Sequence, residues 1–258
     1  MAKKINKRFH AWILFALAVL LLAAAWLMKS FPVLIFAALS PLFAISDQAK
    51  EQPSPWYRFE LILIASAAGL WAAASFSASA LVPVLLQAIA FTLVFVAYVF
   101  AHKNLGPKLG KFTVIFFWLG LEYLALKLPW AAQVHYLANA LVLKAEWYRW
   151  TIYTGYLGVS LWILVANLLF YFSLFRPEGF SALFFGAAVV VVLAPLFYSL
   201  QTAGAAITST TMLEFYTTTS TSLPEKYLQR GEWVARTAAW VSVLILMLAF
   251  VKNYTRKK

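Results

Sequence analysis

The sequence predicts an all-α protein, a polytopic integral membrane helical bundle of about eight transmembrane helices. Of its 258 residues, 64% are hydrophobic and 12% are charged, whereas soluble domains have about 45–50% apolar and about 25% charged residues. The mean hydropathy is +0.80. Apolar runs long enough to cross a bilayer recur along the whole chain, and each run ends at charged or turn-forming residues.

The apolar runs define the predicted spans. The first run follows a basic N-terminal segment and lacks a small-x-small cleavage site, so we expect a retained helix rather than a signal peptide. The second contains Pro32 and Pro41, which bilayer helices tolerate where neighbouring groups satisfy the freed carbonyls. In order, the spans are residues 11–28, 31–45, 59–75, 81–101, 112–128, 157–175, 180–200 and 233–251.

The connecting segments complete the predicted organisation. Residues 1–200 hold the first seven spans, with an interfacial segment near 129–156. Residues 46–58, 102–111 and 176–179 are expected to be loops on the side of the termini. Residues 201–232 are predicted to be a polar, Thr-rich extracytoplasmic loop. Residues 233–258 are predicted to form the last span and a basic cytoplasmic tail.

The charge distribution predicts the topology. The net charge is +12, which in a soluble protein would point to nucleic acid. In this chain about two thirds of the Lys and Arg residues fall on the side that carries both termini, as expected for the cytoplasmic side. We therefore predict a multi-pass protein with both termini in the cytoplasm and no nucleic-acid partner.

The chain lacks the residues that several classes of chemistry require. The chain contains no Cys, which excludes disulfides, thiolate metal sites and cysteine nucleophiles. His10, His102 and His135 do not have the spacing of metal ligands, and glycine-rich nucleotide-binding motifs are absent. We therefore predict no metal, no cofactor and no catalytic residue of a self-contained soluble type.

Two polar residues within apolar helices are candidate contact residues. Glu122 lies near the end of the fifth span, where an ionised carboxylate must be paired, protonated or at a wet surface. Lys127 and Arg149 are candidate partners, so Glu122 is either a structural residue or a headgroup or substrate contact. Asn167 in the sixth span is either a helix-packing amide or a ligand contact.

An aromatic collar precedes the sixth span. Trp147, Tyr148 and Tyr153 surround Arg149, and such rings gather where hydrocarbon meets headgroups. Gly155 and the small residues that follow allow close helix approach. The collar is either an interface anchor or a lipid-binding surface. His135 could lie on the same side of the membrane, and Glu232 belongs to a mixed-charge segment before the last span that could form a surface network.

Three patches together resemble the apolipoprotein N-acyltransferase family. The segment WLGLEYL at 118–124, followed by Leu128, Pro129 and Trp130, resembles the region of the fifth helix of that family. Residues 147–167 resemble its collar and sixth helix, and residues 227–233 resemble its C-terminal end. With eight spans, the likeness covers most of the chain and is weak before about residue 112.

The resemblance implies the membrane domain of this family without its catalytic domain. Family members transfer an acyl chain from phospholipid to the amino group of a lipoprotein, using a nitrilase-like domain with a Glu-Lys-Cys triad. That domain lies between the last two spans, where this chain has only residues 201–230 and no Cys. The resemblance implies the bacterial inner membrane. It also implies lipid or lipoprotein contact for the matching residues Glu122, Trp130, Trp147, Tyr148, Gly155 and Asn167.

The resulting functional hypothesis is a non-catalytic protein that binds phospholipid or a lipoprotein anchor. It would act as a subunit or accessory factor in lipoprotein processing, within a membrane protein complex. The alternative is a membrane-embedded acyltransferase that acts alone, through a site such as Glu122 with His135, or with a separate catalytic chain. A transporter is disfavoured, because intramembrane charges are scarce and no inverted repeat is visible.

Overall fold

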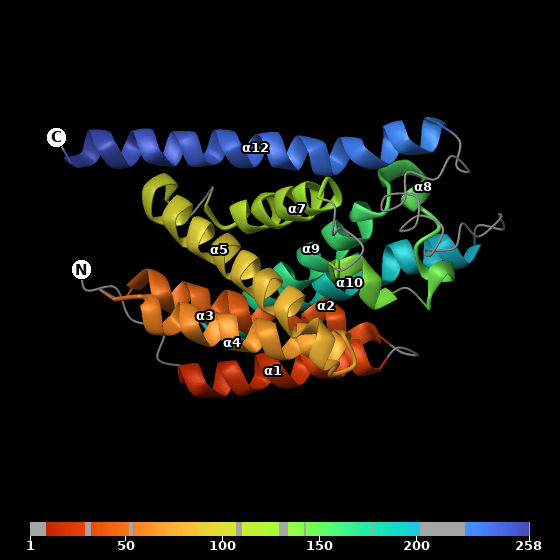
Figure 1. Ribbon diagram of the computed structural model, residues 1–258, viewed down its shortest axis with the longest axis horizontal. Helices are drawn as coiled ribbons and strands as arrows, with labels where there is room; N and C mark the ends of the chain where they lie inside the picture. Colours follow the sequence, from red (N-terminus) through yellow and green to blue (C-terminus); the bar gives the residue numbers. More distant parts are fainter. Residues whose placement is uncertain are drawn as a thin grey trace.

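The computed structural model describes residues 9–28, 32–51, 54–106, 110–128, 134–141, 143–176, 178–201 and 225–257. Within these residues every regular element is a helix (Figure 1). The prediction of an all-α fold is therefore confirmed for the part of the chain that the structure describes.

Long helices follow one another along the chain, joined by short helical turns. The turns are η1 (Pro32–Leu34), η2 (Ala78–Ala80), η4 (Leu137–Leu141), η5 (Ala145–Trp147) and the one-turn α8 (Thr151–Thr154). The longer helices are α1 (Ala11–Leu27), α2 (Ile35–Ala38) with α3 (Ser40–Glu51), α4 (Trp56–Ala73), α5 (Leu81–Leu105), α7 (Thr113–Leu126), α9 (Leu157–Leu174), α10 (Ala182–Gln201) and α12 (Glu225–Lys257).

Five helical segments in the described residues are long and apolar enough to cross a membrane. They are Pro32–Glu51, Ala78–Leu105, Leu157–Leu174, Ala182–Gln201 and Trp233–Arg256. Helices α1 and α7 are apolar but shorter, and α4 carries Arg58 and Glu60 near its start. The eight spans expected from the sequence therefore require α1, α4 and α7 to cross as well.

The long helices form one bundle in which successive helices run in opposite directions (Figure 1). The start of α1 and the end of α12 consequently lie at the same end of the bundle. Helix α1 packs on α4, α9 packs on α10, and α7 packs on both α5 and α12. Helix α12 lies along one side of the bundle over its full length.

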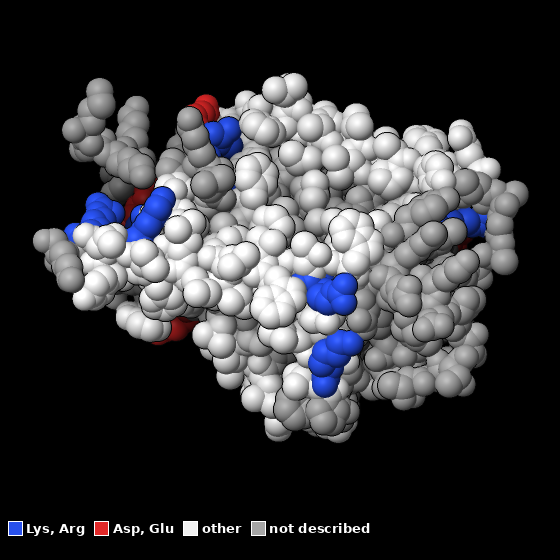
Figure 2. Space-filling view, turned by 90° about the horizontal axis from the view of Figure 1, so that it is seen from above, with Lys and Arg blue, Asp and Glu red and all other residues white. Residues whose placement is uncertain are grey.

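The outer surface of the bundle is apolar. The described residues on the face in Figure 2, which includes α12, are mostly residues other than Lys, Arg, Asp and Glu. A surface of this kind suits hydrocarbon better than water, and it is compatible with a membrane protein. The exposed apolar side chains of α10 and α12 include Leu183, Val190, Phe197, Trp240, Leu244 and Phe250.

Small residues bring α7 and α12 close together. A Cβ at Gly120 would lie 3.1 Å from the Ser242 hydroxyl oxygen and 3.2 Å from the Ala239 Cα. Ala235 and Ala238 are buried on the same helix. Close approach of this kind is a main source of helix association in a bilayer, where the hydrophobic effect does not drive helices together.

A proline in α10 frees a carbonyl that a tryptophan satisfies. Pro195 has no N–H, so the carbonyl of Val191, four residues earlier, lacks its helical donor. The indole N–H of Trp162 on α9 donates to the Val191 carbonyl at 2.6 Å. Helix α10 therefore continues through Pro195 because its neighbour supplies the missing hydrogen bond.

Three predicted loops are partly helical, and one of them is 102–111, whose first residues belong to α5 (Leu81–Leu105). Helix α3 extends to Glu51, into the predicted loop 46–58, and Lys50 there forms an ion pair with Asp47 and donates to the Tyr98 hydroxyl at 3.1 Å. Helix α12 begins at Glu225, so the last part of the predicted loop 201–232 is helical. Residues 202–224 of that loop lie outside the described residues.

Candidate functional site

Glu122 is a buried carboxyl group on α7, only 1% exposed. Its Oε1 accepts the Leu137 backbone N–H at 2.9 Å and the Trp118 indole N–H at 3.3 Å. These contacts are N–H groups, and neither is one of the two cations that the sequence suggested as partners. The Lys127 ammonium instead lies over the Tyr123 ring, 5.4 Å from its centroid.

The acceptor role of Glu122 follows from the short length of α7. Helix α7 has 14 residues, about 21 Å at 1.5 Å per residue, whereas the hydrocarbon core is about 30 Å thick. The chain after α7 would therefore lie at bilayer depth without being a continuous helix. Such backbone is tolerated only where protein groups satisfy its hydrogen bonds.

Side chains from three helices supply hydrogen bonds to the segment 134–141. Gln87 on α5 binds the His135 backbone twice, accepting its N–H at 3.0 Å and donating to its carbonyl at 2.7 Å. Glu122 on α7 accepts the Leu137 N–H. The Ser160 hydroxyl on α9 accepts the Ala138 N–H at 3.3 Å. Helices α5, α7 and α9 thus all meet at this segment.

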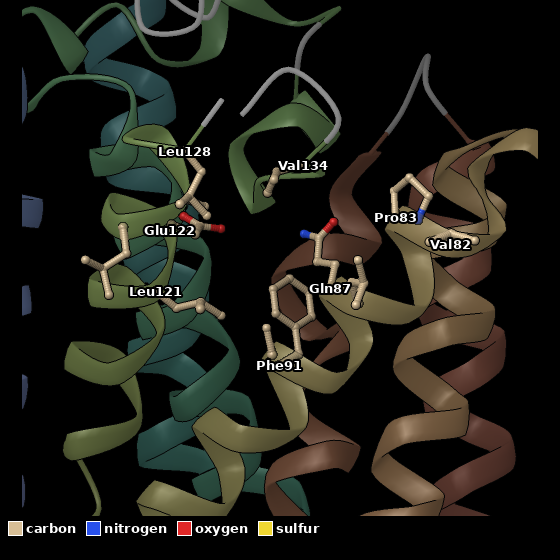
Figure 3. Close-up of a pocket in the computed structure, with 12 residues that line it drawn as sticks. Val82, Pro83, Gln87, Phe91, Leu121, Glu122, Leu128 and Val134 are labelled. Carbon is tan, nitrogen blue, oxygen red and sulfur yellow. The ribbon is translucent and has the colours of Figure 1, made fainter. Parts of the chain in front are cut away.

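Between α5 and α7 lies a cavity of about 440 Å³. That volume is within the range of about 300–1,000 Å³ that ligand sites occupy. Figure 3 shows Glu122 and Gln87 facing one another across it from the two helices. Apart from these two residues, the described lining is apolar: Val82, Pro83, Leu86, Ala90, Phe91, Leu121, Leu124, Ala125, Leu128 and Val134.

The exposure of the lining residues shows where the cavity opens. Leu86 on α5 and Leu124 on α7 are exposed on the outer surface, whereas Phe91 and Glu122 are buried at its floor. Phe91 also stacks on Trp118, with ring centroids 4.3 Å apart. The cavity therefore opens sideways between two apolar helices, toward the space that lipid would occupy.

One oxygen of the cavity lacks a partner within the described residues. Glu122 Oε2 is buried and has no hydrogen bond there. The Ser160 hydroxyl lies beside the same carboxyl group and accepts the Ala138 N–H at 3.3 Å, but it makes no hydrogen bond to Oε2. An unsatisfied buried acceptor costs about 1–3 kcal/mol, so a donor brought by a ligand would relieve a real penalty.

Asn167 is fully buried and all of its amide atoms have partners. Its Oδ1 accepts the Leu39 N–H at 2.7 Å, and its Nδ2 donates to the Ile35 carbonyl at 2.8 Å. Ile35 and Leu39 are four residues apart, so the amide takes the place of one helical backbone hydrogen bond where α2 meets α3. Nδ2 also donates to the Ile163 carbonyl at 2.8 Å. These contacts make Asn167 a helix-packing residue.

The aromatic collar folds partly into the bundle. Tyr148 is buried, Trp147 and Arg149 are half-buried, and the Lys144 ammonium lies 5.8 Å from the Trp147 ring centroid. Gly155 ends α8 with a φ of 77°, a conformation that favours glycine. Trp130 and the side chains of Tyr153 and Glu232 lie outside the described residues.

His135, which is half-buried, and the buried tyrosines near it lie outside the long helices. Burial lowers the pKa of the His135 imidazole, and its ring lies edge-on to Trp26 at 6.2 Å. Burial raises the pKa of the Tyr156 hydroxyl, which donates to Asn139 Oδ1 at 2.5 Å. No hydrogen bond between the His135 ring and Glu122 is recorded in the described residues.

Gln87 was missed in the sequence, although its signal resembles that of Asn167. It is an amide within the apolar helix Leu81–Leu105. Among the described residues, no group of three or more His, Asp or Glu could hold a metal ion. The described arrangement therefore offers an apolar chamber with one open acceptor, which can bind an amphipathic molecule.

Comparison of the chain with protein-family models, with curated proteins and with solved structures finds no match.

Proposed function

We propose that this protein is a non-catalytic membrane protein that binds lipid, either a phospholipid or the anchor of a lipoprotein. The observation that carries the proposal is the cavity between α5 and α7, whose apolar walls open sideways and whose floor holds Glu122. An acyl chain matches the walls, and a polar headgroup matches the floor.

The cellular role that we propose is that of a subunit or accessory factor in lipoprotein processing. It rests on the resemblance of residues 118–124, 147–167 and 227–233 to apolipoprotein N-acyltransferases. We place the protein in the bacterial inner membrane with both termini in the cytoplasm. The excess of Lys and Arg on the side of the termini supports that orientation, as does the position of the start of α1 and the end of α12 at one end of the bundle (Figure 1).

A block of the cavity tests the proposal. Ala90 lines the cavity from α5, and Ala90→Trp would fill it with an indole ring. Leu93→Trp on the same helix is the matched control, because Leu93 is exposed and does not line the cavity. The proteins are purified in mild detergent, and co-purifying lipids are quantified by mass spectrometry. We expect the wild type and Leu93→Trp to retain lipid that Ala90→Trp loses.

Equal lipid content in the two variants would contradict the proposal. The enzymatic alternative is tested with the same preparations, by incubating them with phospholipid and a diacylated lipopeptide. Acyl transfer by the wild type that disappears in Glu122→Gln would replace the non-catalytic proposal with a membrane-embedded acyltransferase. We expect no transfer by either protein.

A further inference from the structure

The polar side-chain atoms that line the cavity differ in whether they already have a hydrogen-bond partner. Both ends of the Gln87 amide are engaged by the His135 backbone. Glu122 Oε1 is engaged by Trp118 and Leu137. Glu122 Oε2 is the lining side-chain oxygen for which the described residues provide no hydrogen bond. Among the side chains that line the cavity, Glu122 Oε2 is therefore the acceptor left for a ligand to engage.

The surroundings of that oxygen favour a cation over a neutral donor. Glu122 is only 1% exposed, so an ionised carboxyl group there carries a cost of desolvation, which the two N–H groups on Oε1 offset only in part. No Lys or Arg is among the described lining residues, so the cavity itself provides no compensating charge. A charge-assisted hydrogen bond is roughly twice as strong as a neutral one.

We propose that Glu122 forms an ammonium-binding subsite, and that the ligand is a membrane amphiphile with a primary amine and an alkyl chain. This inference rests on the proposed function, since it assumes that the cavity holds a lipid-like molecule. Glu122 lies one turn before the end of α7 at Leu126, at the end of the helix that faces the segment 134–141, whose Leu137 N–H it binds. The alkyl chain would extend along the apolar lining toward Phe91 and Leu121, which lie below Glu122 and Gln87 in Figure 3.

Two photoreactive probes test the subsite. One is an alkylamine and the other an alkanol of the same chain length, each with a diazirine at the same carbon. The full-length protein is placed in phosphatidylcholine nanodiscs, because the headgroup of that lipid has no N–H donor. Cross-linked residues are mapped by mass spectrometry. We expect the amine to label α5 and α7 around Ala90 and Leu121, with half-saturation at about tenfold lower concentration than the alkanol.

Glu122→Gln should remove this difference, because its side chain is neutral and nearly the same size. Glu60→Gln, which changes an exposed carboxyl group on α4, should preserve it. A preference for the amine that survives in Glu122→Gln overturns the inference. The comparison of the two probes on the wild-type chain does not depend on whether either variant folds.

The outcomes separate the two proposals. Equal labelling of the cavity by both probes overturns the ammonium subsite and leaves lipid binding standing. Absence of cavity labelling by either probe overturns lipid binding itself. A third arm identifies the source of the amine. Competition by added phosphatidylethanolamine, but not by phosphatidylglycerol, assigns the ammonium to a phospholipid headgroup, and a lack of competition assigns it to another amine-bearing amphiphile.

Discussion

Asn167 on α9 and Glu122 on α7 both accept a backbone N–H from a segment that is not a continuous helix. The Asn167 junction lies where α2 meets α3, and the Glu122 junction lies where residues 134–141 follow α7. At the first junction every amide atom has a protein partner. At the second, Oε2 has none among the described residues.

This difference separates two uses of a buried polar side chain. Asn167 completes a closed set of hydrogen bonds, so its contribution is to stability. Glu122 satisfies the backbone with one oxygen, keeps the other without a partner in the described residues, and lines a cavity, so it can serve structure and binding together. Substitutions at the two positions should therefore differ in kind as well as in size.

The largest loss of stability is expected from Asn167→Ala. The variant leaves the Leu39 N–H and the Ile35 carbonyl buried without partners. At about 1–3 kcal/mol for each of these two unsatisfied groups, we expect the free energy of unfolding to fall by roughly 2–6 kcal/mol. Asn104→Ala is the control, because the Asn104 amide donates to the Phe100 carbonyl within its own helix. Equal losses of stability in unfolding titrations of the two variants would refute the claim that Asn167 completes the hydrogen bonds where α2 meets α3.

A smaller loss is expected from Glu122→Ala, and it should be separable from binding. The variant leaves the Leu137 N–H and the Trp118 indole N–H without their acceptor, but it also removes the unpaired Oε2, so we expect a net loss of about 1–3 kcal/mol. Glu122→Gln keeps an acceptor oxygen and should recover most of that stability without recovering binding of an amine ligand. Unfolding titrations and probe labelling of the same preparations check this. If Glu122→Gln restored both the stability and the binding of the amine ligand, the charge of the carboxylate would not be needed, and its role would be only that of the acceptor Oε1.

The sequence predicted the helices because long apolar runs with charged ends leave few alternatives to membrane helices. It also singled out Glu122 and Asn167, since a polar group in an apolar helix is conspicuous. It did not predict their partners. The Leu39 N–H lies 128 residues from Asn167, and backbone donors have no sequence signature. It likewise did not predict that packing against the bundle buries Tyr148 of the collar.

A third substitution disturbs α7 without changing either polar residue. Gly120→Leu forces a side chain against Ala239 and Ser242 of α12, and overpacking of this kind costs about 1–2 kcal/mol. Gly186→Leu on α10 is the control, because a Cβ there meets open space. Since Glu122 lies on α7, Gly120→Leu should also weaken ligand labelling of the cavity. Hydrogen exchange at Leu39 should be unchanged, and faster exchange there would show that the two junctions are coupled.

The smallest effect is expected from pH, and it should reach only the junction that includes His135. Burial lowers the pKa of this imidazole from its ordinary value of 6.5. As the pH falls below about 6.5, the unfolded chain takes up the proton first, so stability decreases until the pH passes the lower folded-state pKa. Hydrogen exchange should therefore quicken in residues 134–141 between about pH 7.5 and about pH 5, relative to the intrinsic rate at each pH.

The controls for this prediction separate His135 from the other titratable groups. His135→Phe keeps an aromatic ring against Trp26 and should abolish the pH effect, whereas His10→Phe, at an exposed position, should retain it. Exchange at Leu39 should not respond, because Asn167 and its described partners are amide, backbone and hydroxyl groups that do not titrate in this range. A pH response at Leu39 that matched the response at Leu137 would mean that the bundle opens as one unit. The difference in hydrogen bonding between the Asn167 junction and the Glu122 junction would then have no effect on how each of them opens.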